Sequence, residues 1–291
     1  MTAMETRELD SLPSLAPLYT KAVLGTALPG RPDEPPDHAL GLDELEIDRE
    51  RLADYARVCC FTLRDALPPT YPHILGFPLA MCLMSERSFP FSLLGLVHVA
   101  NRIEQSEPIP VSSGPSIRVW AENLRPHRRG RQLDVVTEVR LDDRVAWLEH
   151  STYLRPGEGS GDGRDADGAD PLADATQSAV WKLPGDVGRR YAGVSGDRNP
   201  IHLHPLSARV LGFKGAIAHG MWTLARCLAT LDGSLPAAHT SEVEFRAPVP
   251  IPGTVRLLSK RTEAGWELGL ESPDGERRHL ELSVSTAPSA T

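Results

Sequence analysis

The two halves of the chain repeat one another, and this duplication restricts the possible folds more than any other feature. Short motifs recur at a constant spacing of 136 residues, since 191 − 55 = 136 and 211 − 75 = 136. The matching segments are Tyr55-Ala-Arg-Val58 with Tyr191-Ala-Gly-Val194, and Leu75-Gly-Phe77 with Leu211-Gly-Phe213. A third pair, 103–110 with 243–250, aligns at an offset of 140. We therefore expect two lobes built to one plan.

Each half predicts helices in the same order. Asp48 and Asp186 are suitable N-caps for short helices that end near Val58 and Val194. A longer apolar helix follows, from about Leu79 to Met84 onward in the first half and over 219–231 in the second.

The rest of each half alternates polar and apolar residues with a period of two, as in 116–121, 133–139 and 254–258. Turn signals lie at 129–130, 142–143 and 274–275. A central helix followed by antiparallel strands predicts an α+β fold in which the sheet wraps around the helix. We therefore expect a double hot dog, with two such lobes in one chain.

Composition gives the domain boundaries. Residues 156–176 are rich in Gly and Asp and lack hydrophobic periodicity, which predicts a flexible linker. Residues 1–41 are rich in Pro and turn formers and predict an irregular N-terminal arm lying on the body. The two hot dog lobes then span 42–155 and 177–286.

Charge and residue usage exclude several classes of protein. The chain has 39 acidic and 31 basic residues and a net charge of −8, which disfavours a dedicated nucleic-acid binder. It contains neither a signal-peptide pattern nor an apolar run of about 18 residues, so we expect a cytoplasmic protein without a membrane span. The four cysteines and ten histidines form no metal-ligand motif, and no metal is expected.

The motif that bears on chemistry is Ser195-Gly-Asp-Arg-Asn-Pro-Ile-His202, which carries an acid at Asp197 and an imidazole at His202. It resembles the signature of the MaoC-like dehydratase family, and Ala218-His-Gly-Met221 resembles the segment that opens that family's central helix. The resemblance covers residues 42–286. It implies an (R)-specific enoyl-CoA hydratase or 3-hydroxyacyl-thioester dehydratase, with Asp197 and His202 catalytic.

That reaction adds water across an α,β-unsaturated thioester. It requires a base for water, an acid for the α-carbon and donors for an enolate-like oxygen. Asp197 and His202 can supply both proton transfers, and the sequence leaves open which residue is the base and which the acid. Coenzyme A or the phosphopantetheine of an acyl carrier protein would enter as part of the substrate, so no separate cofactor is expected.

Neighbouring residues are expected to support the pair. Gly196 lets the chain turn, Ser195 braces the loop, and Asn199 holds the loop or the water by hydrogen bonds. Gly220 lies at the predicted start of a helix, where its N–H can bind the thioester oxygen. His219 fits a structural hydrogen bond at the helix start at least as well as direct chemistry.

The first lobe lacks this chemistry. At the offset of 136, apolar residues replace the chemical positions, namely Phe61 for Asp197, Ala66 for His202, Leu83 for His219 and Met84 for Gly220. This favours a non-catalytic lobe whose Phe61 and Met84 line a pocket for a medium or long acyl chain, although both side chains can instead plug the old site.

The sequence leaves three questions open: the role of a basic hairpin, the activity and the oligomeric state. Arg125, His127 and the arginines at 128, 129 and 131 form a basic hairpin, either a solvated turn or a contact for coenzyme A phosphates or an acidic carrier protein. A hot dog thioesterase and a non-catalytic acyl-binding partner of another dehydratase subunit are the rival functions. The chain is expected to be a monomeric pseudo-dimer or a homodimer.

Overall fold

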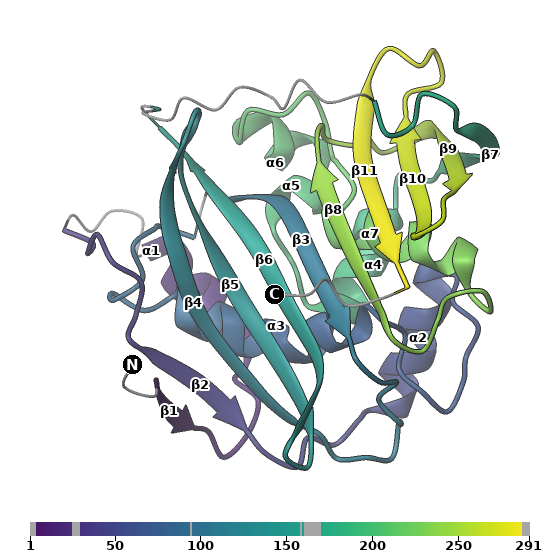
Figure 1. Cartoon of the computed structure of the whole chain (residues 1–291). Coiled ribbons are helices and arrows are strands. Elements are labelled where there is room, and N and C mark those ends of the chain that lie inside the picture. Colours follow the sequence, from purple (N-terminus) through teal and green to yellow (C-terminus); the bar gives the residue numbers. More distant parts are fainter. Residues whose placement is uncertain (1–3, 25–29, 94, 158, 160–169, 287–291) are drawn as a thin grey trace.

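The computed structural model describes residues 4–24, 30–93, 95–157, 159 and 170–286. Its strands form a single sheet in the order β1-β2-β4-β5-β6-β3-β8-β11-β10-β9-β7. The helices α3, α4 and α7 lie behind this sheet in Figure 1. In the part of the chain that the structure describes, no helix has both the length and the apolar character needed to cross a membrane.

The first lobe combines two helices with four antiparallel strands in the order β4-β5-β6-β3. The helices are α2 (Arg49–Cys59) and α3 (Tyr71–Met84). The strands are β3 (Val97–Gln105), β4 (Ser116–His127), β5 (Gly130–Leu141) and β6 (Arg144–Pro156). Helix α3 is apolar on every face and is buried along its length except at His73 and Cys82, as expected of a central helix.

The second lobe repeats this plan with two extra helical turns. Its helices are α4 (Val187–Ser195), α5 (Pro200–Leu203), α6 (Pro205–Val210) and the central α7 (Gly220–Leu228), which continues as the 3-10 turn η2 (Ala229–Leu231). Its strands are β7 (Thr176–Leu183), β8 (His239–Phe245), β9 (Gly253–Arg261), β10 (Gly265–Glu271) and β11 (Arg278–Ser285).

The lobes meet where β3 pairs antiparallel with β8. In this register Arg102 lies opposite Glu242, and the offset of 140 makes these two residues counterparts in the repeat. The helices α2 and α4 also contact each other through the equivalent Tyr55 and Tyr191, whose ring centroids are 6.2 Å apart. A pseudo-two-fold axis therefore relates the lobes, and the double hot dog prediction is confirmed.

The prediction of an irregular N-terminal arm over 1–41 is wrong for three segments, which form two strands and a helix. Strand β1 (Glu5–Glu8) pairs in parallel with β2 (His38–Leu42), which in turn pairs with β4 and so extends the sheet. Between them, α1 (Leu15–Leu24) is a regular helix. The strands are short, and their neighbouring Pro residues concealed them in the sequence.

The predicted linker lies partly outside the described residues, which omit 158 and 160–169. Its C-terminal end belongs to the second lobe. Leu172 is buried beside Gly269, and Asp170 pairs with Arg278 at 3.3 Å. The flexible-linker prediction is therefore wrong for residues 170–176.

One of the repeat matches is also wrong. Leu75 lies inside α3, whereas Leu211-Gly-Phe213 follows α6 and has no part in the central helix. Isolated bridges pair Ala66 with Pro110 and Ile217 with Pro250, so Ala66 is the counterpart of Ile217. The offset changes because α5 and α6 are inserted before the second central helix.

Candidate active site

A short loop between α4 and α5 carries Asp197. It begins at Gly196, which adopts φ = +82° and whose N–H donates to Ala192 O. A Cβ at this position would lie 2.4 Å from Leu15 Cδ1 of α1. Glycine is required here both by the left-handed backbone and by the close approach of another helix.

Hydrogen bonds on both sides hold the Asp197 loop. The Asp197 N–H donates to Ser195 Oγ at 3.1 Å, and Asp197 Oδ1 accepts from the Asn199 N–H at 3.0 Å. Asn199 Oδ1 accepts from the Ile201 N–H at 3.4 Å and caps α5. Ser195 and Asn199 thus fix the direction of the carboxylate.

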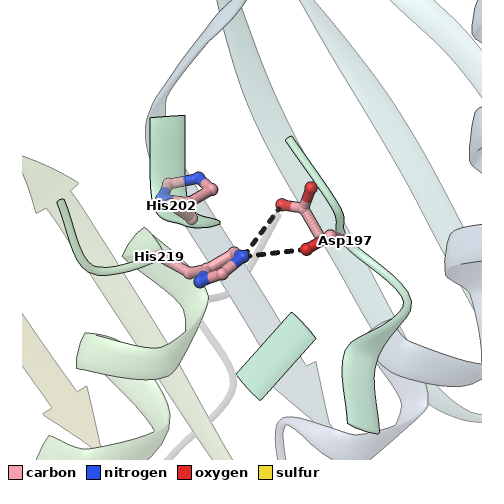
Figure 2. Close-up of side chains that lie close together, drawn as sticks. All are labelled: Asp197, His202 and His219. Carbon is pink, nitrogen blue, oxygen red and sulfur yellow. Dashed lines mark hydrogen bonds and ion pairs between the residues drawn. The ribbon is translucent and has the colours of Figure 1, made fainter. Parts of the chain in front are cut away.

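Three titratable side chains converge at this point, as Figure 2 shows. Polar atoms of Asp197, His202 and His219 lie within 4.8 Å of one another. The two imidazoles stack with centroids 3.7 Å apart, and His219 Nε2 is 3.8 Å from Asp197 Oδ2. His202 lies in α5, and His219 is the residue immediately before α7. The loop that carries Asp197, helix α5 and the start of α7 therefore build the cluster together.

Backbone carbonyls fix the tautomers of both rings, because a carbonyl can only accept a hydrogen bond. His202 Nδ1–H donates to Ile217 O at 2.9 Å, which leaves Nε2 as an acceptor in the neutral ring. His219 Nε2–H donates to the Asp197 backbone carbonyl at 3.0 Å. His219 therefore has the structural hydrogen bond expected for it, beside the Asp197 carboxylate.

Burial and proximity set the charges. Burial lowers the pKa of His202, and burial together with the adjacent His202 lowers the pKa of His219 to about 3. Burial raises the pKa of Asp197, but the neighbouring His219 and His202 outweigh it and lower that pKa overall. At neutral pH the cluster holds an ionised carboxylate and two neutral imidazoles.

Gly220 is the first residue of α7, and its N–H belongs to the group at a helix start that has no intrahelical acceptor. A Cβ on Gly220 would lie 3.1 Å from the ring of Phe245 in β8. The sequence predicted only the role of the Gly220 N–H at the helix start and gave no sign of this contact. Phe245 packing is a reason for glycine at this position.

A cavity of about 670 Å³ opens beside the cluster and is lined by both lobes. The second lobe contributes Asp197, His202, His219, Gly220 and Phe245. The first lobe contributes His73, Ile74 and Phe77 from α3, together with residues 95–99 and Tyr153. Its wall combines apolar side chains with five histidines and three arginines, so it can bind a ligand that has both an apolar and a polar part.

The structure does not place Phe61 and Met84, the residues expected to line an acyl pocket, at the cavity. Phe61 is the true counterpart of Asp197, since each follows a left-handed helix cap, but its ring stacks on Tyr55. Met84 is the last residue of α3 and is buried, so it does not correspond to Gly220.

The remaining counterparts shift accordingly. The Leu67 N–H bonds to Ile109 O as the Ala218 N–H bonds to Val249 O, which aligns Leu67 with Ala218. Pro68 and Pro69 then occupy the positions of His219 and Gly220, in place of Leu83 and Met84. The first lobe thus has Phe61 in place of Asp197, and prolines in place of His219 and Gly220.

The basic hairpin divides into two groups. Arg125 pairs with Asp134 at 2.9 Å, and Arg131 pairs with Asp33 at 2.8 Å. Arg129 instead lines the cavity, together with Arg155 and Arg246. Three arginines thus line the cavity, and the guanidinium of Arg246 also pairs with Glu244 at 2.9 Å and Glu281 at 2.7 Å.

The cluster of Asp197, His202 and His219 also has the composition of a metal site. His202 bonds a backbone carbonyl through Nδ1 and leaves Nε2 open, which is compatible with a metal ligand, but His219 bonds a carbonyl through Nε2, the nitrogen that lies toward Asp197. A cation bound between Asp197 and His219 Nε2 would displace that hydrogen bond. The donor set therefore fits proton transfer better than metal binding.

Several residues beside the cavity escaped the sequence analysis, among them Tyr19, His73, His98 and Glu149. One signal was available. Strand alternation puts Glu149 on the same side of β6 as the buried Trp147, and an acid on an inward-facing side is unusual. Tyr19 had no comparable signal, because its partners are 177 and 179 positions away.

Comparison with known proteins supports the same assignment. Residues 176–279 match the MaoC like domain. The chain is 37% identical over 256 residues to 3-hydroxyacyl-thioester dehydratase X of Mycobacterium tuberculosis, covering 87% of this chain and 91% of that protein.

Solved structures agree with this match. The crystal structure of HtdX from Mycobacterium tuberculosis superposes with a TM-score of 0.75 at 37% identity, covering 85% of this chain and 99% of that one. A MaoC-like dehydratase from Phytophthora capsici shares the fold, with a TM-score of 0.66 at 16% identity over 86% of this chain and 94% of that one. The chain belongs to the MaoC-like dehydratase family.

Proposed function

We propose that the protein catalyses the reversible, (R)-specific hydration of trans-2-enoyl thioesters to 3-hydroxyacyl thioesters in fatty acyl metabolism. The observation that carries this proposal is the pairing of two hydrogen-bond acceptors, the Asp197 carboxylate and His202 Nε2, beside the Gly220 N–H in one cavity. A hydratase needs acceptors for water and a donor for the thioester oxygen.

In the proposed mechanism the thioester carbonyl accepts from Gly220 N–H at the start of α7. One water lies between Asp197 and His202, and one of the two takes its proton as the oxygen attacks C3. The same pair returns a proton to C2, so water adds from one face of the double bond. Dehydration follows these steps in reverse, and no cofactor takes part.

The carrier and chain length are further parts of the proposal. Arg129, Arg155 and Arg246 line the cavity and suit the phosphates of coenzyme A or of a carrier protein's phosphopantetheine. The apolar first-lobe wall, including Ile74 and Phe77, suits a medium or long acyl chain. A cytoplasmic location and a pseudo-dimeric monomer or homodimer stay predictions.

The test is incubation with trans-2-enoyl-CoA substrates of increasing length. We expect the absorbance of the conjugated enoyl group to fall without release of free thiol, and chiral analysis to give the (R)-3-hydroxyacyl product. Thiol release at the rate of substrate loss would indicate a thioesterase instead. Binding without either change would indicate a non-catalytic acyl-binding subunit, and an (S) product would contradict the proposed orientation.

A further inference from the structure

A second histidine–carboxylate pair lines the cavity from the first lobe. His73 in the first turn of α3 has Nδ1 2.9 Å from both carboxylate oxygens of Glu149. Glu149 is 1% exposed, and its Oε1 also accepts from Asn101 Nδ2 at 2.7 Å. Among these three residues only His73 lines the cavity. The mechanism above does not use this pair.

The fold does not require an ion pair at these positions. His73 lies six residues after Leu67 and Leu224 lies six after Ala218, so Leu224 is the counterpart of His73. Glu149 pairs across the sheet with Ile103, as Leu282 pairs with its counterpart Val243. The same scaffold therefore accepts two buried leucines in the second lobe.

A buried ion pair seldom stabilises a fold more than apolar side chains of similar volume do. Its presence in only one lobe, with the imidazole at the cavity wall, is better explained by a ligand than by folding. The side chain of His73 is 11% exposed, and the Glu149 contact occupies only Nδ1. The atom that remains for a ligand is Nε2.

Ring contacts place His73 close to the reaction centre. On one side, Phe77 is a neighbour of His73 in α3 and lies 3.8 Å from the position of a Cβ on Gly196, the residue before Asp197. On the other side, His98 stacks on His73 with centroids 6.4 Å apart and contacts Phe245, which covers Gly220. His73 thus lies between neighbours of both catalytic segments.

We propose that His73, held by Glu149, is a catalytic residue supplied by the first lobe and donates Nε2–H to the oxygen on C3 of the bound acyl thioester. This inference rests on the proposed hydratase function. The oxygen belongs to the attacking water in hydration and to the departing hydroxyl in dehydration. His73 keeps its proton, so the transfers assigned to Asp197 and His202 remain balanced.

The surrounding charges favour a donor. Burial lowers the pKa of His73, but Glu149 raises it more strongly and Asp197 adds to that effect, so the net shift is upward. The other titratable groups that face this network are His98, whose pKa is lowered to about 4, and Tyr153, whose pKa is raised by burial. Both are therefore neutral near pH 7, and His73 is the histidine of this network whose pKa is shifted toward the protonated form.

The experiment compares His73→Phe, His73→Gln and Glu149→Gln with the wild type on straight-chain trans-2-enoyl-CoA. We expect kcat to fall about a hundredfold in His73→Phe, which has no donor. His73→Gln keeps an amide N–H and should recover part of that loss. The matched control is His150→Gln, since His150 faces Glu122 at 3.8 Å and does not line the cavity.

The pH profile separates this role from a structural one. If protonated His73 is the active form, activity is lost as pH rises through its pKa. Removing the Glu149 charge lowers that pKa, so the alkaline limb of kcat in Glu149→Gln should move to lower pH. A structural defect alone would reduce kcat without moving the limb. The His73 variants keep the inference testable if Glu149→Gln fails to fold.

Two results would overturn the inference. One is a folded His73→Phe protein with near wild-type kcat and an unchanged alkaline limb. The other is normal turnover of straight chains with a loss confined to chains that carry an extra hydroxyl group, which would make His73 a specificity determinant for the acyl chain. Failure of the wild type to hydrate any enoyl thioester would instead contradict the proposed function.

Discussion

The phenol of Tyr19 lies 2.7 Å from the backbone nitrogen of Arg198, from which it accepts a hydrogen bond. The same hydroxyl donates to the Gly196 carbonyl at 2.9 Å. Tyr19 in α1 therefore holds both residues that flank Asp197, and a segment far away in the sequence fixes the position of the Asp197 carboxylate.

We predict that Tyr19→Phe lowers kcat about tenfold with little change in KM. The substitution removes both hydrogen bonds, each of which contributes about 1 kcal/mol, and leaves the packing of the ring intact. Steady-state kinetics and a melting curve test this. Thr20→Ala is the matched control, since it removes a neighbouring hydroxyl that bonds only within α1. Wild-type kcat in Tyr19→Phe would show that the loop holds itself.

We predict that Asp197→Asn and His202→Ala each lower kcat about a hundredfold or more while the protein still folds. Each change removes one of the two acceptors in the cavity. Hydration assays, with circular dichroism as a check of folding, test the prediction. Asp186→Asn is a suitable control because the Asp186 side chain makes no capping hydrogen bond at α4. Near wild-type turnover in either folded variant would refute the assignment.

We predict that Gly220→Ala lowers turnover because its new methyl group displaces Phe245, which lies 3.1 Å away. The double variant Gly220→Ala with Phe245→Leu restores space and should regain part of the activity. Kinetics of both variants and of Phe245→Leu alone measure the coupling. Strictly additive effects would mean that this contact does not position the oxyanion donor.

We predict that acid weakens the fold less in His98→Gln than in the wild type. The pKa of His98 is lowered to about 4 by burial, against about 6.5 in an unfolded chain. Between these values the unfolded chain binds more protons, so stability falls as pH falls below about 6.5. Between pH 7 and pH 5 the free energy of unfolding should therefore fall by on the order of 1 kcal/mol less in His98→Gln than in the wild type. Denaturant unfolding at the two pH values tests this, and equal losses would contradict it.

We predict that EDTA leaves hydratase activity unchanged. His219 Nε2–H, which lies toward the Asp197 carboxylate, donates to a backbone carbonyl, so a cation between these two residues would have to displace that hydrogen bond. Activity before and after chelation and dialysis is the measurement. A loss that zinc restores would show that Asp197, His202 and His219 form a metal site.

Local patterns in the sequence predicted the start of α2 and the turn that carries Asp197, but not the start of α3, which was expected near Leu79 and lies at Tyr71. Asp48 caps α2 as predicted, with its carboxylate accepting from the Glu50 and Arg51 N–H groups. Turn formers, period-two alternation and the Asp197 motif depend on a few neighbouring residues, so one sequence is enough to read them.

Features that depend on distant contacts were not predictable in this way. Strand β1 has four residues, and its place in the sheet depends on pairing with β2 some thirty residues later. The cavity wall depends on how two lobes dock, which the alignment at a single offset misjudged at Met84. The His73 and Glu149 pair joins residues 76 positions apart and has no motif of its own.

The β3–β8 junction bears on how the two lobes evolved. Arg102 Nε donates to Glu242 Oε1 at 2.6 Å, and these residues occupy the same position in the two repeats. An assembly of two identical lobes would place arginine against arginine or glutamate against glutamate at this point, with like charges repelling across the strands. Opposite charges at the symmetry axis are therefore possible only between two lobes of different sequence. The charges at this junction therefore favour pairing between the two different lobes over pairing between two copies of one lobe. Since the lobes need not be identical, each can change its sequence independently of the other.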